Sequence, residues 1–167
     1  MAEVRVPTMP HGHSLEKDVD YRAGVVAGLL GAIISGLFVM IVTSFTETDF
    51  FFLAKLTSGL VVSEEIASGA IGIIIGLGIV LFVGVVFGIG FGMLFTLLTN
   101  SYALIPTLVL GLIYGFGLWF LSFLVTGPVA GTEIVDMIGP AIALPAYLIM
   151  GLVLGVCYRE FRTIRRT

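Results

Sequence analysis

Few side chains in this sequence have the chemistry that catalysis or metal binding requires. Both histidines, His11 and His13, lie near the N-terminus, where two imidazoles without carboxylate or thiolate neighbours make a poor metal site. Cys157 is the single cysteine, so it has no dithiol partner, and no nearby histidine would activate it. We interpret it as a small apolar packing residue. We therefore predict no catalytic residues, no metal site and no cofactor, and we expect that the chain is not an enzyme.

Two other patterns resemble binding sites. The segment Gly88-Ile89-Gly90-Phe91-Gly92 is glycine-rich, but it lies in a long apolar stretch and follows no strand, which argues against a phosphate-binding loop. Glu133 and Asp136 stand three residues apart in a polar segment. They are either two solvated acids or a contact for a cation or for a partner's arginine.

The polar groups inside the apolar stretches are hydroxyls and one indole. They belong to Ser35, Thr96, Tyr114, Trp119, Ser122 and Tyr147. We expect Ser35 and Ser122 to bond back to their own helix or across to a neighbour, at about 0.6 kcal/mol each. Pro145 lies inside the last apolar stretch, where it is expected to kink a helix. A kinked helix beside glycines would line a small cavity, and this would favour transport or the binding of a lipophilic ligand.

The composition shows which elements must position these groups. The chain has 167 residues, of which 58% are hydrophobic and only 11% charged, and its mean hydropathy is +1.15. Soluble domains carry about 25% charged residues. A soluble fold could not cover its surface with so few charges, so the chain belongs to the membrane class. Its net charge of −3 offers no basic surface for nucleic acid.

Four stretches are long and apolar enough to span a bilayer, which needs roughly 20 residues. They cover about residues 23–42, 66–98, 102–125 and 138–158. The second is expected to start after a cap at Ser63, and its 33 residues require tilt, protrusion or a bend at its glycines. We predict an all-α polytopic membrane protein, with a polar tail (1–20), a tightly packed four-helix transmembrane domain (21–160) and a basic C-terminal tail (161–167).

The connections and the charges predict a topology. The short polar break Thr99-Asn100-Ser101 predicts a tight hairpin between the second and third spans. Residues 43–65 form either a short helix lying flat at the bilayer interface or an apolar loop. Seven of the eight Lys and Arg residues lie beside the two termini, and only Lys55 lies on the other side. The positive-inside rule therefore predicts that both termini are cytoplasmic.

Glycines spaced four residues apart recur in all four spans, and small residues at this interval let helix backbones approach closely. The predicted helix-packing glycines are Gly24, Gly28, Gly36, Gly72, Gly76, Gly84, Gly88, Gly92, Gly111, Gly115, Gly151 and Gly155. In the second span, each glycine lies about 40° further around the helix than the glycine four residues before it. The two halves of this helix therefore present their glycine grooves in different directions. This span is therefore our candidate for the central helix.

A faint repeat relates the two halves of the chain. Gly28-Leu29-Leu30-Gly31 aligns with Gly111-Leu112-Ile113-Tyr114, and each segment is followed by a loop and another glycine-rich span. The first and second spans, and likewise the third and fourth, would then form two hairpins that run in the same direction. Because low-complexity apolar sequence imitates repeats easily, chance similarity is the alternative.

Residues 23–158 loosely resemble uncharacterised small four-helix, glycine-rich integral membrane proteins of prokaryotes, through their glycine spacing, short turn and basic C-terminus. The resemblance implies a prokaryotic plasma membrane and carries no functional motif. Our first hypothesis is a non-catalytic accessory or scaffold subunit of a larger membrane complex, most plausibly respiratory or energy-transducing. Its partners would be the lipid bilayer and other membrane subunits. The alternative is a small oligomeric transporter or channel for a neutral or weakly polar solute.

Overall fold

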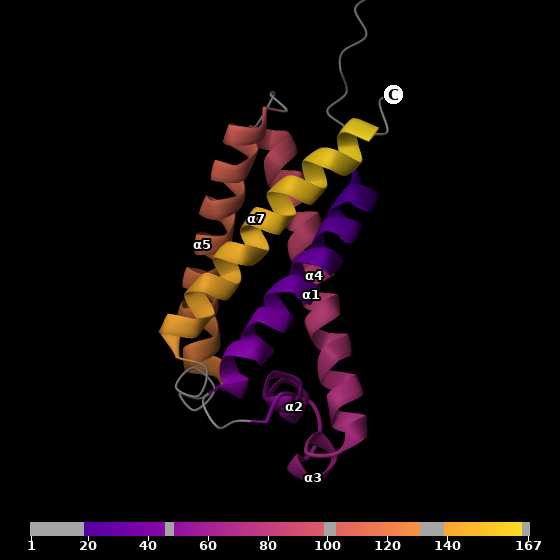
Figure 1. The fold of residues 1–167 in the computed structure, drawn as a ribbon, viewed down its shortest axis with the longest axis vertical. Helices are drawn as coiled ribbons and strands as arrows, with labels where there is room; N and C mark the ends of the chain where they lie inside the picture. The colour runs from indigo at the N-terminus through magenta and orange to yellow at the C-terminus, as the bar shows by residue number, and fades with distance from the viewer. Residues whose placement is uncertain (1–18, 46–48, 99–102, 131–138, 165–167) are drawn as a thin grey trace, which may run out of the picture.

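The computed structural model describes residues 19–45, 49–98, 103–130 and 139–164, and every regular element in these ranges is an α-helix (Figure 1). Four long helices are apolar and long enough to cross a membrane: α1 (Tyr21–Ser44), α4 (Ala70–Leu98), α5 (Leu104–Ala130) and α7 (Pro140–Ile164). Two short helices, α2 (Phe52–Gly59) and α3 (Glu64–Ala67), lie together at one end. The predicted all-α polytopic fold is confirmed.

The start of α1 and the end of α7 lie at the same end of the bundle, which we call the terminal end (Figure 1). The opposite end carries α2 and α3 and is called the α2 end. This arrangement follows from an even number of spans. Which end faces the cytoplasm stays a prediction from the basic residues, and the polar tail of residues 1–18 lies outside the described residues.

The four long helices pack in the order α4, α1, α7, α5, with α1 and α7 in the middle. The second span, α4, is therefore not the central helix, and that prediction was wrong. The predicted tight hairpin between α4 and α5 is also wrong. These two helices meet around Tyr114, whose hydroxyl donates to the backbone oxygen of Phe87 at 2.9 Å, and do not pack along their length. The turn Thr99-Asn100-Ser101 itself lies outside the described residues.

The predicted 33-residue span is divided near its start. Ser63 precedes α3 rather than the span and makes no side-chain capping bond, and α4 begins at Ala70. The chain folds back between them so closely that a Cβ on Gly72 would lie 2.5 Å from the Cα of Ala67. The predicted span of 33 residues was too long for the bilayer core without tilt, protrusion or a bend. Because α4 has only 29 residues, its length exceeds the bilayer core by less.

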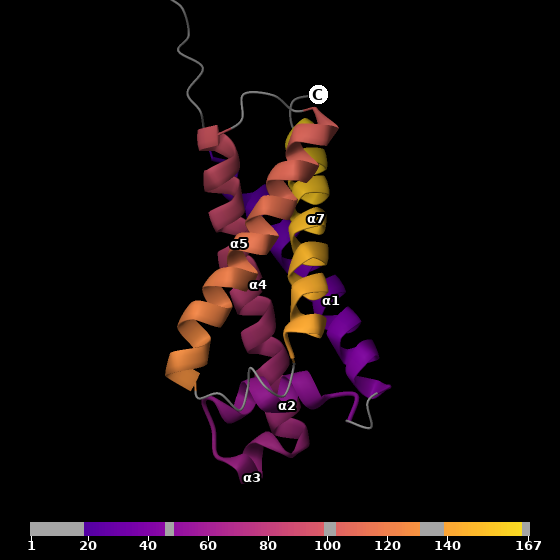
Figure 2. The ribbon, with the colours of Figure 1, turned by 90° about the vertical axis from the view of Figure 1, so that its left-hand side faces the viewer.

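The segment between the first two spans contains a helix rather than only a loop, and its position at the bilayer interface stays a prediction. Helix α2 runs across the ends of the long helices (Figure 2). Its buried residues, Ala54 and Ser58, are one turn apart. Gly76 of α4 makes room for this contact, since a Cβ there would lie 2.9 Å from the Cα of Ala54. The α2 half of α4 thus packs against α2, as the drift of its glycine row predicted.

The middle of α4 packs against α1 through bare backbone. A Cβ on Gly88 would lie 2.6 Å from the Cα of Gly28, and one on Gly24 would lie 2.9 Å from the oxygen of Gly88. Such distances are far shorter than ordinary carbon contacts of about 3.5–4.0 Å. We call this set, Gly24, Gly28, Gly84 and Gly88, the first glycine interface. Only residues without a side chain permit this approach, which brings backbone atoms into dispersion contact.

The same contact recurs between α5 and α7. A Cβ on Gly151 would lie 3.1 Å from the Cα of Gly115, and one on Gly155 would lie 2.9 Å from the oxygen of Thr107. We call Gly111, Gly115, Gly151 and Gly155 the second glycine interface. Gly111 meets Gly151 as Gly28 meets Gly84. Gly28 and Gly111, which the repeat in the sequence aligns, therefore occupy equivalent positions in the two interfaces. The pair α1 and α4 and the pair α5 and α7 are two antiparallel hairpins with the same kind of glycine contact.

Aromatic side chains fill the terminal half of the bundle. Phe91, Phe95 and Tyr158 are fully buried, and their ring centroids lie 5.2–6.1 Å apart. The Tyr158 ring lies against Gly92, where a Cβ would be 2.8 Å from Cε2. Here α4 and α7 touch each other directly. The cluster therefore closes the terminal half of the bundle.

Candidate functional site

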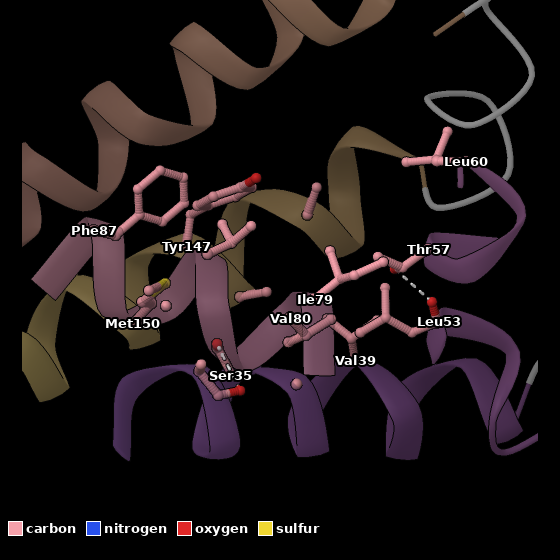
Figure 3. Close-up of a pocket in the computed structure, with 16 residues that line it drawn as sticks. Ser35, Val39, Leu53, Thr57, Leu60, Ile79, Val80, Phe87, Tyr147 and Met150 are labelled. Carbon is pink, nitrogen blue, oxygen red and sulfur yellow. Dashed lines mark hydrogen bonds between the residues drawn. The ribbon is translucent and has the colours of Figure 1, made fainter. Parts of the chain in front are cut away.

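A cavity of about 350 Å³ lies toward the α2 end (Figure 3). Helices α1, α4 and α7 form its walls, and α2 covers it with Leu53, Thr57 and Leu60. Ligand pockets commonly occupy 300–1,000 Å³ and are mostly apolar. The cavity is therefore large enough for a small molecule or for part of a larger one.

The packing of the long helices explains why a cavity forms here. Both α4 and α7 pack along α1, and they meet each other at the terminal half, through Tyr158 and Gly92. Toward the α2 end they diverge, with Phe87 and Val80 on one wall and Tyr147 and Met150 on the other. Helix α5 passes beyond these walls (Figure 3), and none of its described residues lines the space.

Small residues on the walls leave this space unfilled. They are Ala32, Gly36, Gly84, Ala143 and Ala146. Gly36 behaves differently from the other predicted packing glycines, because a Cβ there would meet only Cγ1 of Val80, at 3.9 Å. Its role in the structure is to widen the cavity rather than to bring two backbones together.

The polar groups of the cavity are hydroxyls that already have partners. Ser35 donates to the oxygen of Gly31 at 2.7 Å, and Thr57 donates to the oxygen of Leu53 at the same distance. None of the sixteen lining residues is charged at neutral pH. A charged molecule would lose its hydration here without gaining a counter-charge, so the lining favours a neutral and mainly apolar occupant.

Tyr147 connects the cavity to α5. Its hydroxyl lies 2.8 Å from the hydroxyl of Ser122 on that helix. Ser35 thus bonds back to its own helix and Ser122 bonds across, the two arrangements that the sequence analysis expected. Helix α7 begins with Pro140 directly after Gly139, whose φ of +66° favours glycine, and continues through Pro145. Pro145 lies just ahead of Ala146 and Tyr147, which face the cavity.

The remaining candidate residues lie away from the cavity or outside the described residues. Cys157 is half-buried and packs against the aromatic cluster, as predicted. Gly90 and Gly92 lie within α4, and Gly92 faces Tyr158. The tail histidines, His11 and His13, and the acids Glu133 and Asp136 lie outside the described residues. Within the described ranges, no three His, Cys, Asp or Glu side chains gather where they could hold a metal.

The cavity residues on α2 were not identified from the sequence. Leu53, Thr57 and Leu60 follow a helical spacing of four and three residues, whereas Ala54 and Ser58 occupy the face toward α4. This amphipathic pattern was visible in the sequence. The missing information was that the chain folds back at Ser68-Gly69, which brings α2 over one end of the cavity.

In comparisons with known proteins, the chain matches no family model, no curated protein and no solved structure. The loose resemblance to small four-helix prokaryotic membrane proteins therefore stays a prediction. The argument for function accordingly rests on the geometry of the chain itself.

Proposed function

We propose that this chain is a non-enzymatic membrane protein that binds a neutral, mainly apolar molecule in the cavity at its α2 end. The observation that carries the proposal is a space of about 350 Å³ between the spans, in which none of the described lining residues is charged and Ser35 and Thr57 are already hydrogen-bonded. This supports the solute-handling alternative of the sequence analysis in a narrower form. Uptake from the bilayer and release on either side would make the same site part of a transport cycle.

The test compares a variant that fills the cavity with one that leaves it open. Gly36→Leu places a side chain in the cavity, where a Cβ has only Val80 nearby. Gly117→Leu is the matched control, because it makes the same change within a helix at a position with nothing within 4 Å. A ligand that binds only the folded state stabilises it by RT ln(1 + L/Kd), where L is the free ligand concentration, so the unfolding temperature rises with the ligand concentration relative to Kd.

The assay is thermal unfolding of the purified protein in nanodiscs, with and without dodecanol as a neutral twelve-carbon probe. Dodecanol should raise the midpoint of the wild type and of Gly117→Leu, and it should leave Gly36→Leu unchanged. Equal shifts for all three proteins would show that the alcohol acts through the bilayer, and the proposal would fail.

A second candidate function is that of an accessory subunit, as the sequence analysis proposed first. Gly78 on α4 and Gly117 on α5 are exposed, and a Cβ on either would meet nothing within 4 Å. They form shallow gaps on the outer faces of the two flanking helices, and small residues of this kind permit close contact with another helix. Respiratory or energy-transducing complexes in a prokaryotic plasma membrane are the assemblies that we propose.

Isolation of the chain from its native membrane in mild detergent tests the second candidate. Specific companion proteins should copurify with the wild type, and Gly78→Leu or Gly117→Leu should release them without unfolding the isolated chain. A chain that always migrates alone would contradict the subunit role. This result would leave the cavity proposal untouched.

A further inference from the structure

We infer that the occupant of the cavity is one hydrocarbon chain of a bilayer lipid whose head group is zwitterionic rather than anionic. The inference rests on the proposed function and specifies the ligand of the same site. Three features carry it: the route by which the cavity meets the membrane, its size, and the charge of the α2 end.

The cavity lies at the depth of the spans, between α1, α4 and α7. Its walls diverge between α4 and α7, while the aromatic cluster closes the terminal half and α2 covers the other end. Helix α5 passes beyond this space, and its Ser122 contacts the cavity-lining Tyr147 of α7. We place the entrance of the cavity between α4 and α7, where no described residue of α5 lines it, so that a molecule enters from the lipid phase, in which hydrocarbon chains are the most abundant apolar groups.

The size of the cavity suits a chain rather than a compact molecule with polar groups. At about 30 Å³ for each water-sized group, about 350 Å³ holds about a dozen such groups, close to the length of the buried part of an acyl chain. The lining contacts extend along α1 from Ala32 to Val39 and along α4 from Ile79 to Phe87. At about 1.5 Å for each residue, these stretches measure about 10–12 Å.

The charges at the α2 end select the head group. Among the described residues there, Asp49, Glu64 and Glu65 are acidic and Lys55 is basic. Lys55, within α2, forms an ion pair with Asp49, which lies just before this helix. A phosphate with a tethered ammonium group can place its cation beside these acids, whereas an anionic head group would be repelled.

Native mass spectrometry of the intact detergent-purified protein tests this inference with three probes: dioleoylphosphatidylcholine, dioleoylphosphatidylglycerol and dodecanol. We expect one phosphatidylcholine to bind the wild type and Gly117→Leu. Binding to Gly36→Leu should be at least about tenfold weaker, because the leucine occupies space for about four carbons. Phosphatidylglycerol should bind about 2- to 5-fold more weakly than phosphatidylcholine at low salt.

Ala143→Leu, which fills the cavity from α7, provides the same comparison if Gly36→Leu does not fold. Equal phospholipid binding by the filled and open variants would overturn the inference, as would a preference for phosphatidylglycerol. A dimer that Gly36→Leu abolishes would assign the cavity to a second copy of the chain and would also overturn it. Cavity-dependent binding of dodecanol without phospholipid would overturn the inference but preserve the proposed function. Binding of no probe would contradict both.

Discussion

Replacing Gly88 by alanine should destabilise the bundle, although alanine is the better helix former. The added Cβ would lie 2.6 Å from the Cα of Gly28 and 2.7 Å from its nitrogen. Both are backbone atoms, so no side chain can rotate away. Helices α1 and α4 must separate by about 1 Å to restore an ordinary contact, and a gap of this size removes about a quarter to a half of each dispersion contact along the interface.

The magnitude follows from two opposing effects. Overpacking of a close contact costs about 1–3 kcal/mol, whereas replacing glycine in a helix gains about 0.5–1 kcal/mol. We therefore expect Gly88→Ala to lower the free energy of unfolding by about 0.5–2 kcal/mol. Gly78→Ala is the control, because its Cβ has nothing within 4 Å, so only the gain applies and the protein should become more stable.

The assay is reversible unfolding of the purified protein in mixed micelles of increasing dodecyl sulfate content, followed by circular dichroism. The two variants should shift the midpoint in opposite directions. Gly151→Ala in the second glycine interface should behave like Gly88→Ala, since its Cβ would lie 3.1 Å from the Cα of Gly115. If Gly88→Ala proves as stable as Gly78→Ala, backbone contact does not hold α1 and α4 together.

Three further changes test other parts of the structure. Tyr158→Ala should lower the free energy of unfolding by about 3–5 kcal/mol, because it leaves a cavity in the aromatic cluster. Tyr158→Phe should lower it by less than about 1.5 kcal/mol, because the hydroxyl makes only a long hydrogen bond, of 3.4 Å, to the oxygen of Gly92. Chemical unfolding of the two variants measures the difference. Hydrogen bonds from Lys55 and from the backbone of Phe51 hold the pKa of Asp49 below its ordinary value of 3.8. The ionised carboxylate should therefore stabilise α2 above pH 3.8, and this stabilisation should be lost as the pH falls below 3.8 and Asp49 is protonated. Hydrogen exchange of α2 measures this loss, and Asp49→Asn should remove the pH dependence. A reporter active only outside the cytoplasm, fused after Thr167, should give no signal, and a strong signal would reverse the predicted orientation.

The sequence was sufficient to predict the helices because lipid imposes a simple requirement. A span needs enough consecutive apolar residues, and the described helices begin and end within a few residues of most predicted bounds. The exception is the second span, where the apolar run continues through Ser68-Gly69 and hides the break between α3 and α4. Hydropathy detects polar interruptions, and here the interruption is a change of backbone direction within apolar sequence.

The pairing of helices was less predictable than their existence. The spacing of Gly24, Gly28, Gly84 and Gly88 showed that close contacts would form, but a GxxxG pattern does not identify its partner. The prediction of a central α4 failed because its glycine row is used by α1 and by the short helix α2, not by two long spans. The cavity was foreseen only as a possible consequence of Pro145, since its shape depends on how far α4 and α7 diverge.

The two glycine interfaces also have a mechanical consequence. Each interface joins two helices through backbone atoms, which cannot rotate away as a side chain can. We therefore expect each hairpin to be rigid. The joint between the hairpins is softer, because Gly31 of α1 faces the flexible side chain of Met150, with a Cβ-to-Cγ separation of 3.4 Å. A change in the distance between α4 and α7 is therefore expected at the contact between α1 and α7, with each hairpin moving as a whole.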